Sequence, residues 1–186
     1  MTTDELSAPP GAVLTRLPPS PAIQAEYCGT ADEIRLHLHA EVPLAALAYW
    51  ERLCGRRRFP PRALFNPMEL RRHLPLIFML DVEPDGEFRY RVVGSVISDF
   101  FGVGNPVGKT PRDVFGDNAA VALMPLETCC ANRLPYMHTS SASWLYRDRT
   151  YVHYTVLLLP FGETDAAVDK VLCVAEFASE EEAKHA

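Results

Sequence analysis

The stretch GVGNPVGKT, residues 102–110, is the part of this sequence that looks most like a phosphate-binding loop. Such a loop needs a glycine five residues before the Gly-Lys-Thr glycine, so that several backbone N–H groups converge on the phosphates. Val103 stands where that first glycine is required, and Pro106 removes a backbone donor from the middle of the loop. We therefore interpret the glycines as residues that let the chain reverse between short helices, where a side chain would clash.

Two histidines and a glutamate in the segment HLHAE have a spacing that suits a metal site. In an extended strand His37, His39 and Glu41 share one face, and their side chains are of the types that bind zinc. No fourth ligand is evident, and IRLHLH also fits a half-buried strand that alternates apolar and polar residues. We therefore expect no metal site in this segment.

The cysteines and serines do not form a reactive pattern. The five cysteines are odd in number and lack CxxC spacing, so they support neither a disulfide framework nor a zinc site. They are Cys28, Cys54, Cys129, Cys130 and Cys173. The segment SSAS lacks the Gly-x-Ser-x-Gly turn that positions a serine nucleophile, so the sequence predicts no catalytic residues.

Composition describes an ordinary globular protein. The chain has 186 residues, of which 48% are hydrophobic and 23% charged, enough to build the core of one domain. Its net charge of −6 argues against a nucleic-acid partner, which requires a basic surface. The N-terminus lacks the features of a signal peptide, and no apolar run reaches the roughly 18–20 residues that span a bilayer. We expect a cytoplasmic protein with no membrane partner.

The ends of the chain differ in character from its middle. Residues 1–30 are rich in proline and poor in large apolar side chains, which predicts a flexible tail. We expect one domain over residues 31–178, followed by an acidic tail over residues 179–186.

The clearest predicted element is a helix over residues 41–54. Leu47, Trp50 and Leu53 recur at helical spacing and define its apolar face. Three arginines at 56–58 follow the helix, where cations complement the helix dipole. A patch that binds phosphate or nucleic acid is the alternative for this basic cluster.

Strand patterns dominate the rest of the chain. Two β-branched and aromatic runs flank the turn EPDGE, and the turn YRDR connects two later runs. Short helical pieces occupy residues 98–116, and a longer apolar helix over 118–131 contains Pro125. The expected strands are 76–82, 88–97, 136–145, 149–160 and 168–178. This order predicts an α+β fold with five antiparallel strands.

One succession of motifs in this sequence resembles the PAS domain. It consists of a strand ending R-x-x-G, then FG, five further residues, GK and an apolar helix ending VF. The chain is most similar to a single-domain, bacterial and largely alphaproteobacterial PAS-like group first catalogued as a domain of unknown function. That group shares a tryptophan helix, an arginine-and-proline connection, the pair LD…RYR…G and a strand ending Leu-Leu-Pro. The matching pieces here are Trp50, GRRRFPPR, FMLDV with FRYRVVGS, Gly102, Gly108-Lys109 and LLLPF, within residues 40–178.

This resemblance implies a five-stranded antiparallel sheet with short helices on one face and an additional N-terminal helix. PAS domains sense small ligands or dock on partners, and generally have no catalysis of their own. We therefore expect a non-enzymatic regulatory module that docks on a separate signalling protein such as a histidine kinase. A sensor that binds a small organic metabolite in the PAS cavity is the alternative, and a small enzyme that uses this cavity is a third possibility.

The cofactors known in PAS domains leave sequence marks. Flavin photoreceptors of this class resemble NCRF around a reactive cysteine, and nothing here matches. Haem-binding members use a histidine on the long helix, which residues 118–131 lack. A thiolate of Cys129 or Cys130 is the remaining haem ligand, although buried cysteine usually acts as a small hydrophobe. We predict no cofactor and leave open an unidentified small organic ligand.

Alternation along the strands suggests which residues line a pocket. If YRDR closes a hairpin, His138 and Trp144 share a face with Tyr151 and His153, and Tyr154 lies on the opposite face. One face should line a cavity beneath the small helices, with the helix that carries Trp50, or a second subunit, covering the other. The candidate pocket residues are Phe100, Phe101, Trp144, His153 and Tyr154. We expect a homodimer, with Leu47, Trp50 and Leu53 in the packing of the N-terminal helix.

Arg91 is the strongest single candidate for ligand binding. It lies in the middle of an apolar strand, where an unpaired guanidinium is costly. It should either pair with an internal carboxylate such as Asp81 or Asp113, or bind an anionic ligand, which its planar fork suits.

Overall fold

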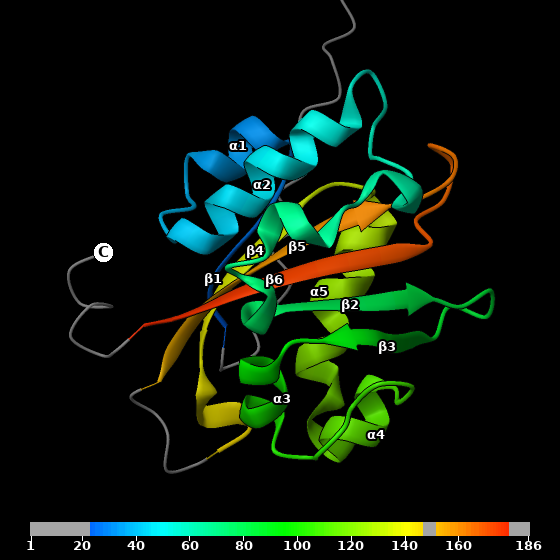
Figure 1. The fold of residues 1–186 in the computed structure, drawn as a ribbon. Coiled ribbons are helices and arrows are strands. Elements are labelled where there is room, and N and C mark those ends of the chain that lie inside the picture. Colours follow the sequence, from blue (N-terminus) through cyan, green and yellow to red (C-terminus); the bar gives the residue numbers. More distant parts are fainter. Residues whose placement is uncertain (1–22, 147–151, 179–186) are drawn as a thin grey trace, which may run out of the picture.

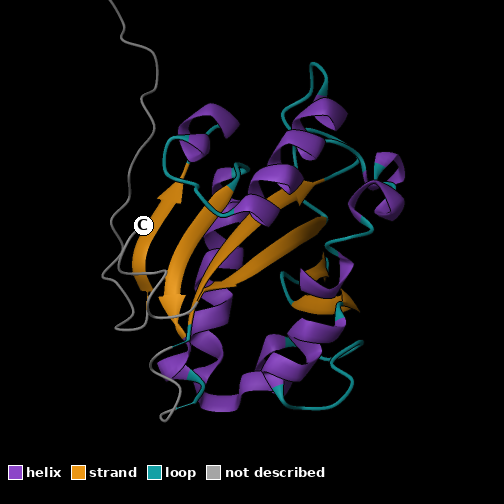
Figure 2. Cartoon of the chain, turned by 60° about the vertical axis from the view of Figure 1, so that its left-hand side comes forward, coloured by secondary structure: helices purple, strands orange, loops and turns teal. Residues whose placement is uncertain are grey.

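The computed structural model describes residues 23–146 and 152–178. Six antiparallel strands form one sheet, in the order β1-β4-β5-β6-β2-β3, with helices on both of its faces (Figures 1 and 2). The strands are β1 (Ile23–Cys28), β2 (Ile77–Val82), β3 (Phe88–Val93), β4 (Tyr136–Ser141), β5 (His153–Phe161) and β6 (Lys170–Ala178).

Five α-helices and five 3-10 turns connect these strands in the described part of the chain. The α-helices are α1 (Ala31–Arg35), α2 (Glu41–Cys54), α3 (Ser95–Phe101), α4 (Pro111–Phe115) and α5 (Ala119–Asn132). The 3-10 turns are η1 (Arg62–Leu64), η2 (Pro67–Leu70), η3 (Leu74–Leu76), η4 (Gly116–Asn118) and η5 (Ala142–Trp144). None of the helices within these residues is long and apolar enough to cross a membrane.

The N-terminal part of the fold differs from the expectation. β1 lies within the expected tail of residues 1–30 and pairs with β4, so the sheet has six strands instead of five. The expected strand IRLHLH is wrong as well, because its first residues form α1, which begins with a capping box between Thr30 and Glu33. Residues 1–22 and 179–186 and the predicted turn YRDR, apart from Tyr146, lie outside the described residues.

The predicted strand over residues 88–97 ends early because the chain turns at Gly94. The Gly94 N–H donates to the carbonyl of Ile77 at 2.7 Å, and α3 begins at the next residue. A Cβ atom at position 94 would lie 2.2 Å from the carbonyl oxygen of Leu74 and 2.4 Å from that of Pro75. Only glycine fits this close approach of two backbone segments.

Helix α2 covers one face of the sheet with a hydrophobic core of its own. Its bounds coincide with those expected from the sequence. Leu47 and Trp50 are buried, Leu53 is half-buried, and the Trp50 indole N–H donates to the carbonyl of Pro160 in β5 at 2.8 Å. The chain's own helix therefore covers this face, which is the first of the two expected alternatives.

Helices α3, α4 and α5 cover the other face, where a second hydrophobic core lies. Alternate residues of β5 separate the two cores: Val156 and Leu158 belong to the core beneath α5, and Leu157 to the core beneath α2. Pro125 lies inside α5 and is buried. The sheet is therefore an internal layer between two cores, and the small helices enclose the face on which the cavity lies.

Candidate functional site

An apolar cavity of about 70 Å³ lies between the sheet and helices α3, α4 and α5. Strands β2 to β6 supply its floor, and the three helices and η5 supply its walls. Aromatic and aliphatic side chains make up nearly all of its lining, and the aromatic ones include Phe78, Phe100, Phe101, Phe115, Trp144 and Phe177. These rings pack edge to face or tilted, as in the contact of Phe101 with Phe115 at 5.0 Å. The cavity is therefore enclosed by well-packed apolar and aromatic side chains.

Four of the six predicted pocket residues line this cavity. They are Phe100 and Phe101 of α3, Trp144 of η5 and Tyr154 of β5. His153, the residue before Tyr154, does not line it, because successive side chains of a strand point to opposite faces. The His153 Nδ1 atom instead lies 3.3 Å from the side-chain nitrogen of Gln24 in β1.

Trp144 and Tyr154 place a polar contact in the wall of the cavity. The indole N–H of Trp144 donates to the hydroxyl of Tyr154 at 2.6 Å. Burial raises the pKa of Tyr154, so its hydroxyl stays protonated at neutral pH. The Tyr154 ring also contacts Phe100 at 5.7 Å, which links η5, β5 and α3 around the cavity. This contact satisfies the indole N–H, so Trp144 presents mainly apolar surface.

His138 of β4 is the polar residue of the cavity that the sequence interpretation did not select. Its side chain lines the cavity and only 6% of the residue is exposed. Its Nδ1 atom is buried and has no hydrogen-bond partner among the residues that the structure describes. Burial lowers its pKa from 6.5 to about 4, so the imidazole is neutral at physiological pH. The lining of the cavity thus includes a neutral imidazole whose Nδ1 atom is buried without a partner among the described residues.

The position of His138 follows from the strand register. Ser140 pairs with Tyr154 and His138 pairs with Val156, which places His138 on the same face as Tyr154. The register that the sequence predicts differs by one residue and puts His138 on the face of His153. A shift of one residue transfers every side chain of a strand to the other face. The 3-10 turn at residues 142–144 interrupts the expected long strand and produces this shift.

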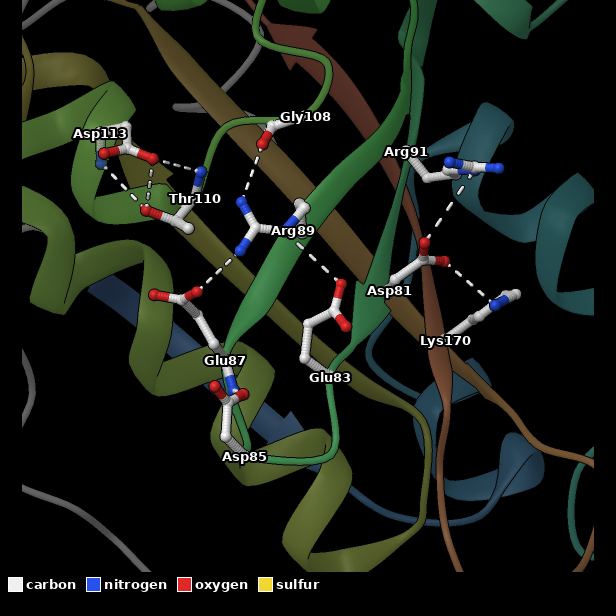
Figure 3. A network of polar contacts seen from close by, with 10 residues as sticks. All are labelled: Asp81, Glu83, Asp85, Glu87, Arg89, Arg91, Gly108, Thr110, Asp113 and Lys170. Atoms are coloured by element: carbon white, nitrogen blue, oxygen red, sulfur yellow. Dashed lines mark hydrogen bonds and ion pairs between the residues drawn. The ribbon is translucent and has the colours of Figure 1, made fainter.

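Arg91 lies outside the cavity, on the edge strand β3 (Figure 3). Met79 pairs with Val92 and Leu80 with Tyr90, so Arg91 is the extra residue of a β-bulge. Its side chain is 72% exposed, and its Nε atom is 4.0 Å from Asp81, which Lys170 also approaches at 3.0 Å. The expectation of an apolar environment is wrong, because the guanidinium is exposed to solvent and Arg91 does not line the cavity. Of the two roles expected for Arg91, the structure shows the ion pair with Asp81.

The Gly-Lys-Thr stretch has a structural role in this region. Arg89 donates to the carbonyl of Gly108 at 2.9 Å, a contact drawn in Figure 3, and the Gly108 N–H donates to the backbone carbonyl of Tyr90 at 2.8 Å. Thr110 is the N-cap of α4 and forms a capping box with Asp113, the other carboxylate proposed to meet Arg91. These hydrogen bonds use the groups that a nucleotide would need. They hold the loop against β3 and direct α4 over the cavity.

The cysteines proposed as haem ligands are buried thiols. Cys129 is fully buried, and its thiol donates to the carbonyl of Leu134 at 3.3 Å. Burial raises the pKa of Cys129 well above its usual value and that of Cys130 to about 12. Neither of them lines the cavity, whereas Cys173 of β6 does. Over residues 23–146 and 152–178, no three His, Cys, Asp or Glu side chains are grouped to hold a metal ion.

A family model described as a PAS domain matches residues 39–175. Among solved structures, the chain is similar to one described as an RNA-binding light-oxygen-voltage receptor, at 14% identity and a TM-score of 0.42. That alignment covers 68% of this chain and 38% of the receptor chain, so the receptor's binding properties are not transferred. A search of curated proteins returned no match.

Proposed function

The chain belongs to the PAS domain family, and on this premise we propose that it is a sensor whose cavity binds a small organic molecule. Domains of this family are generally sensory modules without enzymatic activity, and no catalysis is proposed here. The observation that carries the proposal is His138, which lines a mostly apolar cavity and whose buried Nδ1 atom has no hydrogen-bond partner among the described residues. A buried polar atom of this kind favours a ligand that supplies the missing hydrogen bond.

The lining of the cavity defines the chemistry of the ligand. Since the imidazole of His138 is neutral, one ring nitrogen donates and the other accepts a hydrogen bond. A charged ligand would lose its hydration without meeting an opposite charge, which is costly in an apolar site. The proposed ligand is therefore neutral and mostly apolar, with one polar group that reaches His138.

The volume of the cavity sets the size of the ligand. At about 70 Å³ it is smaller than the roughly 150 Å³ cavity that binds benzene in an engineered protein. It suits a molecule of a few heavy atoms, and a ring requires movement of the wall. Pro125 of α5 lines the cavity and lacks a backbone N–H, so the helix has one hydrogen bond fewer at this point. A larger ligand should enter by displacing this part of the wall.

From the sequence we expect the domain to dock on a signalling protein, and in this proposal the bound ligand controls that docking. Binding beneath α3 and α5 would change how the domain engages a separate signalling protein, such as a histidine kinase. Direct docking without a ligand is the competing function, and it predicts that changes to the cavity leave the partner interaction unaltered.

The first test is a denaturing mass spectrum of the freshly purified protein, which reveals a co-purifying molecule. The second is a titration of isotope-labelled protein with 1-propanol, a neutral donor of a few heavy atoms, and with propionate, a charged molecule of similar size. We expect 1-propanol to shift the NMR signals of the His138 imidazole and the Trp144 indole, and propionate to leave them unchanged.

Two variants make this test specific to the cavity. His138→Phe should abolish the response to 1-propanol, because the apolar ring removes the ring nitrogen and reduces the space. His153→Phe is the matched control, since His153 precedes Tyr154 on the opposite face of β5 and should leave the response intact. Absence of both a co-purifying molecule and a response to 1-propanol would contradict the sensor function.

A further inference from the structure

Basic residues concentrate in one stretch of an otherwise acidic chain. Residues 52–73 contain one carboxylate, that of Glu69, and seven arginines. The arginines are Arg52, Arg56, Arg57, Arg58, Arg62, Arg71 and Arg72. Since the whole chain has a net charge of −6, the remaining residues carry −12 when this segment of +6 is subtracted. Residues 52–73 are therefore a basic stretch of an acidic protein, and we name their exposed side chains the arginine surface.

The fold holds the arginine surface in place. It runs from the last turn of α2 through η1 and η2, in cyan to green in Figure 1. Phe59 and Phe65 anchor it in the core beneath α2, and the Asn66 N–H donates to the Tyr49 hydroxyl at 2.7 Å. Arg52 lies 3.6 Å from Glu69, which joins the end of α2 to η2. The arginines are thus displayed on a fixed backbone, so a partner meets a preorganised surface.

Four of these guanidinium groups are available to a partner. Arg56, Arg58, Arg71 and Arg72 are exposed, and their side chains have neither an ion pair nor a hydrogen bond within the described residues. Arg57, by contrast, donates to the carbonyl of Glu163 at 2.5 Å and holds the stretch to the loop after β5. An arginine fork pairs with a carboxylate through two parallel hydrogen bonds, so these four groups suit acidic side chains.

Two exposed apolar side chains lie in the same stretch of the chain, residues 52–73. Leu64 of η1 is 51% exposed and Met68 of η2 is 58% exposed. An unbranched thioether adapts to different partner shapes, and methionine is frequent at binding surfaces. The combination of unpaired arginines and exposed Leu64 and Met68 matches a polypeptide that presents acidic and apolar side chains together.

We propose that the arginine surface docks an acidic segment of a partner protein that contains apolar anchor residues. A nucleic-acid backbone would satisfy the arginines but offers no complement to Leu64 and Met68. An anionic membrane is favoured by a continuous apolar helix face, whereas these two side chains lie on short 3-10 turns. Glu69 within the surface and Asp165 at its border would repel a uniformly negative polymer or membrane. A folded or extended protein segment can place its charges around them.

The test uses a short fluorescent peptide of glutamate and leucine residues, with binding measured by fluorescence anisotropy. Matched peptides replace glutamate by glutamine or leucine by serine, and duplex DNA and phosphatidylserine vesicles represent the other anionic partners. We expect the glutamate–leucine peptide to bind in a salt-dependent manner and both matched peptides to bind more weakly.

Paired variants locate the site on the chain. Arg56→Glu combined with Arg72→Glu should weaken peptide binding by about tenfold, from the loss of two partly exposed ion pairs. Arg91→Glu combined with Arg112→Glu produces the same change in net charge at exposed positions elsewhere and should have little effect. Leu64→Ser with Met68→Ser should also weaken binding, whereas Val96→Ser with Val107→Ser should not.

Several results would overturn the proposal. They are failure of the peptide to bind, equal losses in the paired controls, or DNA or vesicles that bind as tightly as the peptide. Thermal melting of each variant shows whether it is folded. His138→Phe should bind the peptide like the wild type, so failure of the sensor function and failure of this docking surface give different results.

Discussion

His138 shows how one buried side chain gives the cavity both its chemistry and its sensitivity to acid. An imidazole in an apolar environment remains uncharged because the protonated form would lose its hydration. The pKa of about 4 in the folded state, against 6.5 in the unfolded state, expresses that penalty. The neutral ring preserves an acceptor or donor for a ligand across the physiological pH range.

This lowered pKa predicts how stability depends on pH. As pH falls from about 6.5 to about 4, the unfolded chain binds a proton at His138 that the folded chain excludes, so the free energy of unfolding decreases. The total loss from this residue is roughly 3 kcal/mol, at 1.36 kcal/mol for each unit of pKa shift. Below the folded pKa the two states bind this proton equally and the loss is complete.

Urea unfolding of the wild type, His138→Phe and His138→Gln over this pH range measures the effect. Carboxylates elsewhere contribute to all three proteins, so the difference between the wild type and the variants isolates His138. Both variants should lose less stability on acidification than the wild type. Equal losses in the three proteins would show that the imidazole is hydrated in the folded state.

Individual residues also show what the sequence reveals about the site. Phe100, Phe101, Trp144 and Tyr154 line the cavity as predicted, because large aromatic residues in these elements have few other places to be buried. Arg91 was misplaced by a β-bulge and His138 by a register shift of one residue. The positions of Arg91 and His138 both depend on which residues pair between neighbouring strands. The residue types alone do not determine that pairing.

At the level of elements, the junction between β3 and α3 is the tightest backbone contact described above. Gly94 lies against the carbonyl groups of η3, so the start of α3 and one wall of the cavity depend on that contact. The pattern of β-branched residues continues past this glycine, which explains why the sequence predicted a longer strand. The pattern of β-branched and aromatic residues located β3, but it contains no information about the backbone of η3, which packs against Gly94.

We expect Gly94→Ala to destabilise the protein by about 3 kcal/mol, as overpacking against rigid backbone does. Gly29→Ala is the milder comparison, because its added Cβ would displace only the side chain of Glu33 and should cost no more than the contact of that side chain with Thr30, about 1 kcal/mol. Thermal or urea unfolding of the two variants compares them directly. A Gly94→Ala protein as stable as Gly29→Ala would show that η3 can shift at little energetic cost.

At the level of the whole molecule, the sheet has a separate hydrophobic core on each face. Helix α2 was predicted from its apolar periodicity to within the observed bounds, whereas β1 escaped detection because a short edge strand has a weak pattern. The family resemblance supplied the arrangement of the sheet and helices. It did not supply the sixth strand, which adds to the edge formed by β4.

Trp50 tests whether the core beneath α2 belongs to the fold or to an assembly. The homodimer expected from the sequence was based on PAS dimers in which an N-terminal helix covers this sheet face, and within one chain α2 packs on it. Trp50→Asp should therefore destabilise the protein by more than about 4 kcal/mol, because it buries an unpaired charge and leaves a cavity. Circular dichroism and gel filtration distinguish loss of folding from loss of assembly. A folded variant with an altered oligomeric state would favour the dimer.

The two-sided sheet also has a consequence for how this family can diversify. The His138 cavity and the arginine surface lie over different cores, and substitutions at distant sites usually contribute additively to stability. If the two proposed functions hold, a lineage can change the ligand through mutations beneath α3 and α5 while it retains its partner. Another lineage can acquire a new partner through changes around η1 and η2 while it retains its ligand. Successive side chains of β5 and β6 point into opposite cores, so preferences for the ligand and for the partner could evolve independently within one domain.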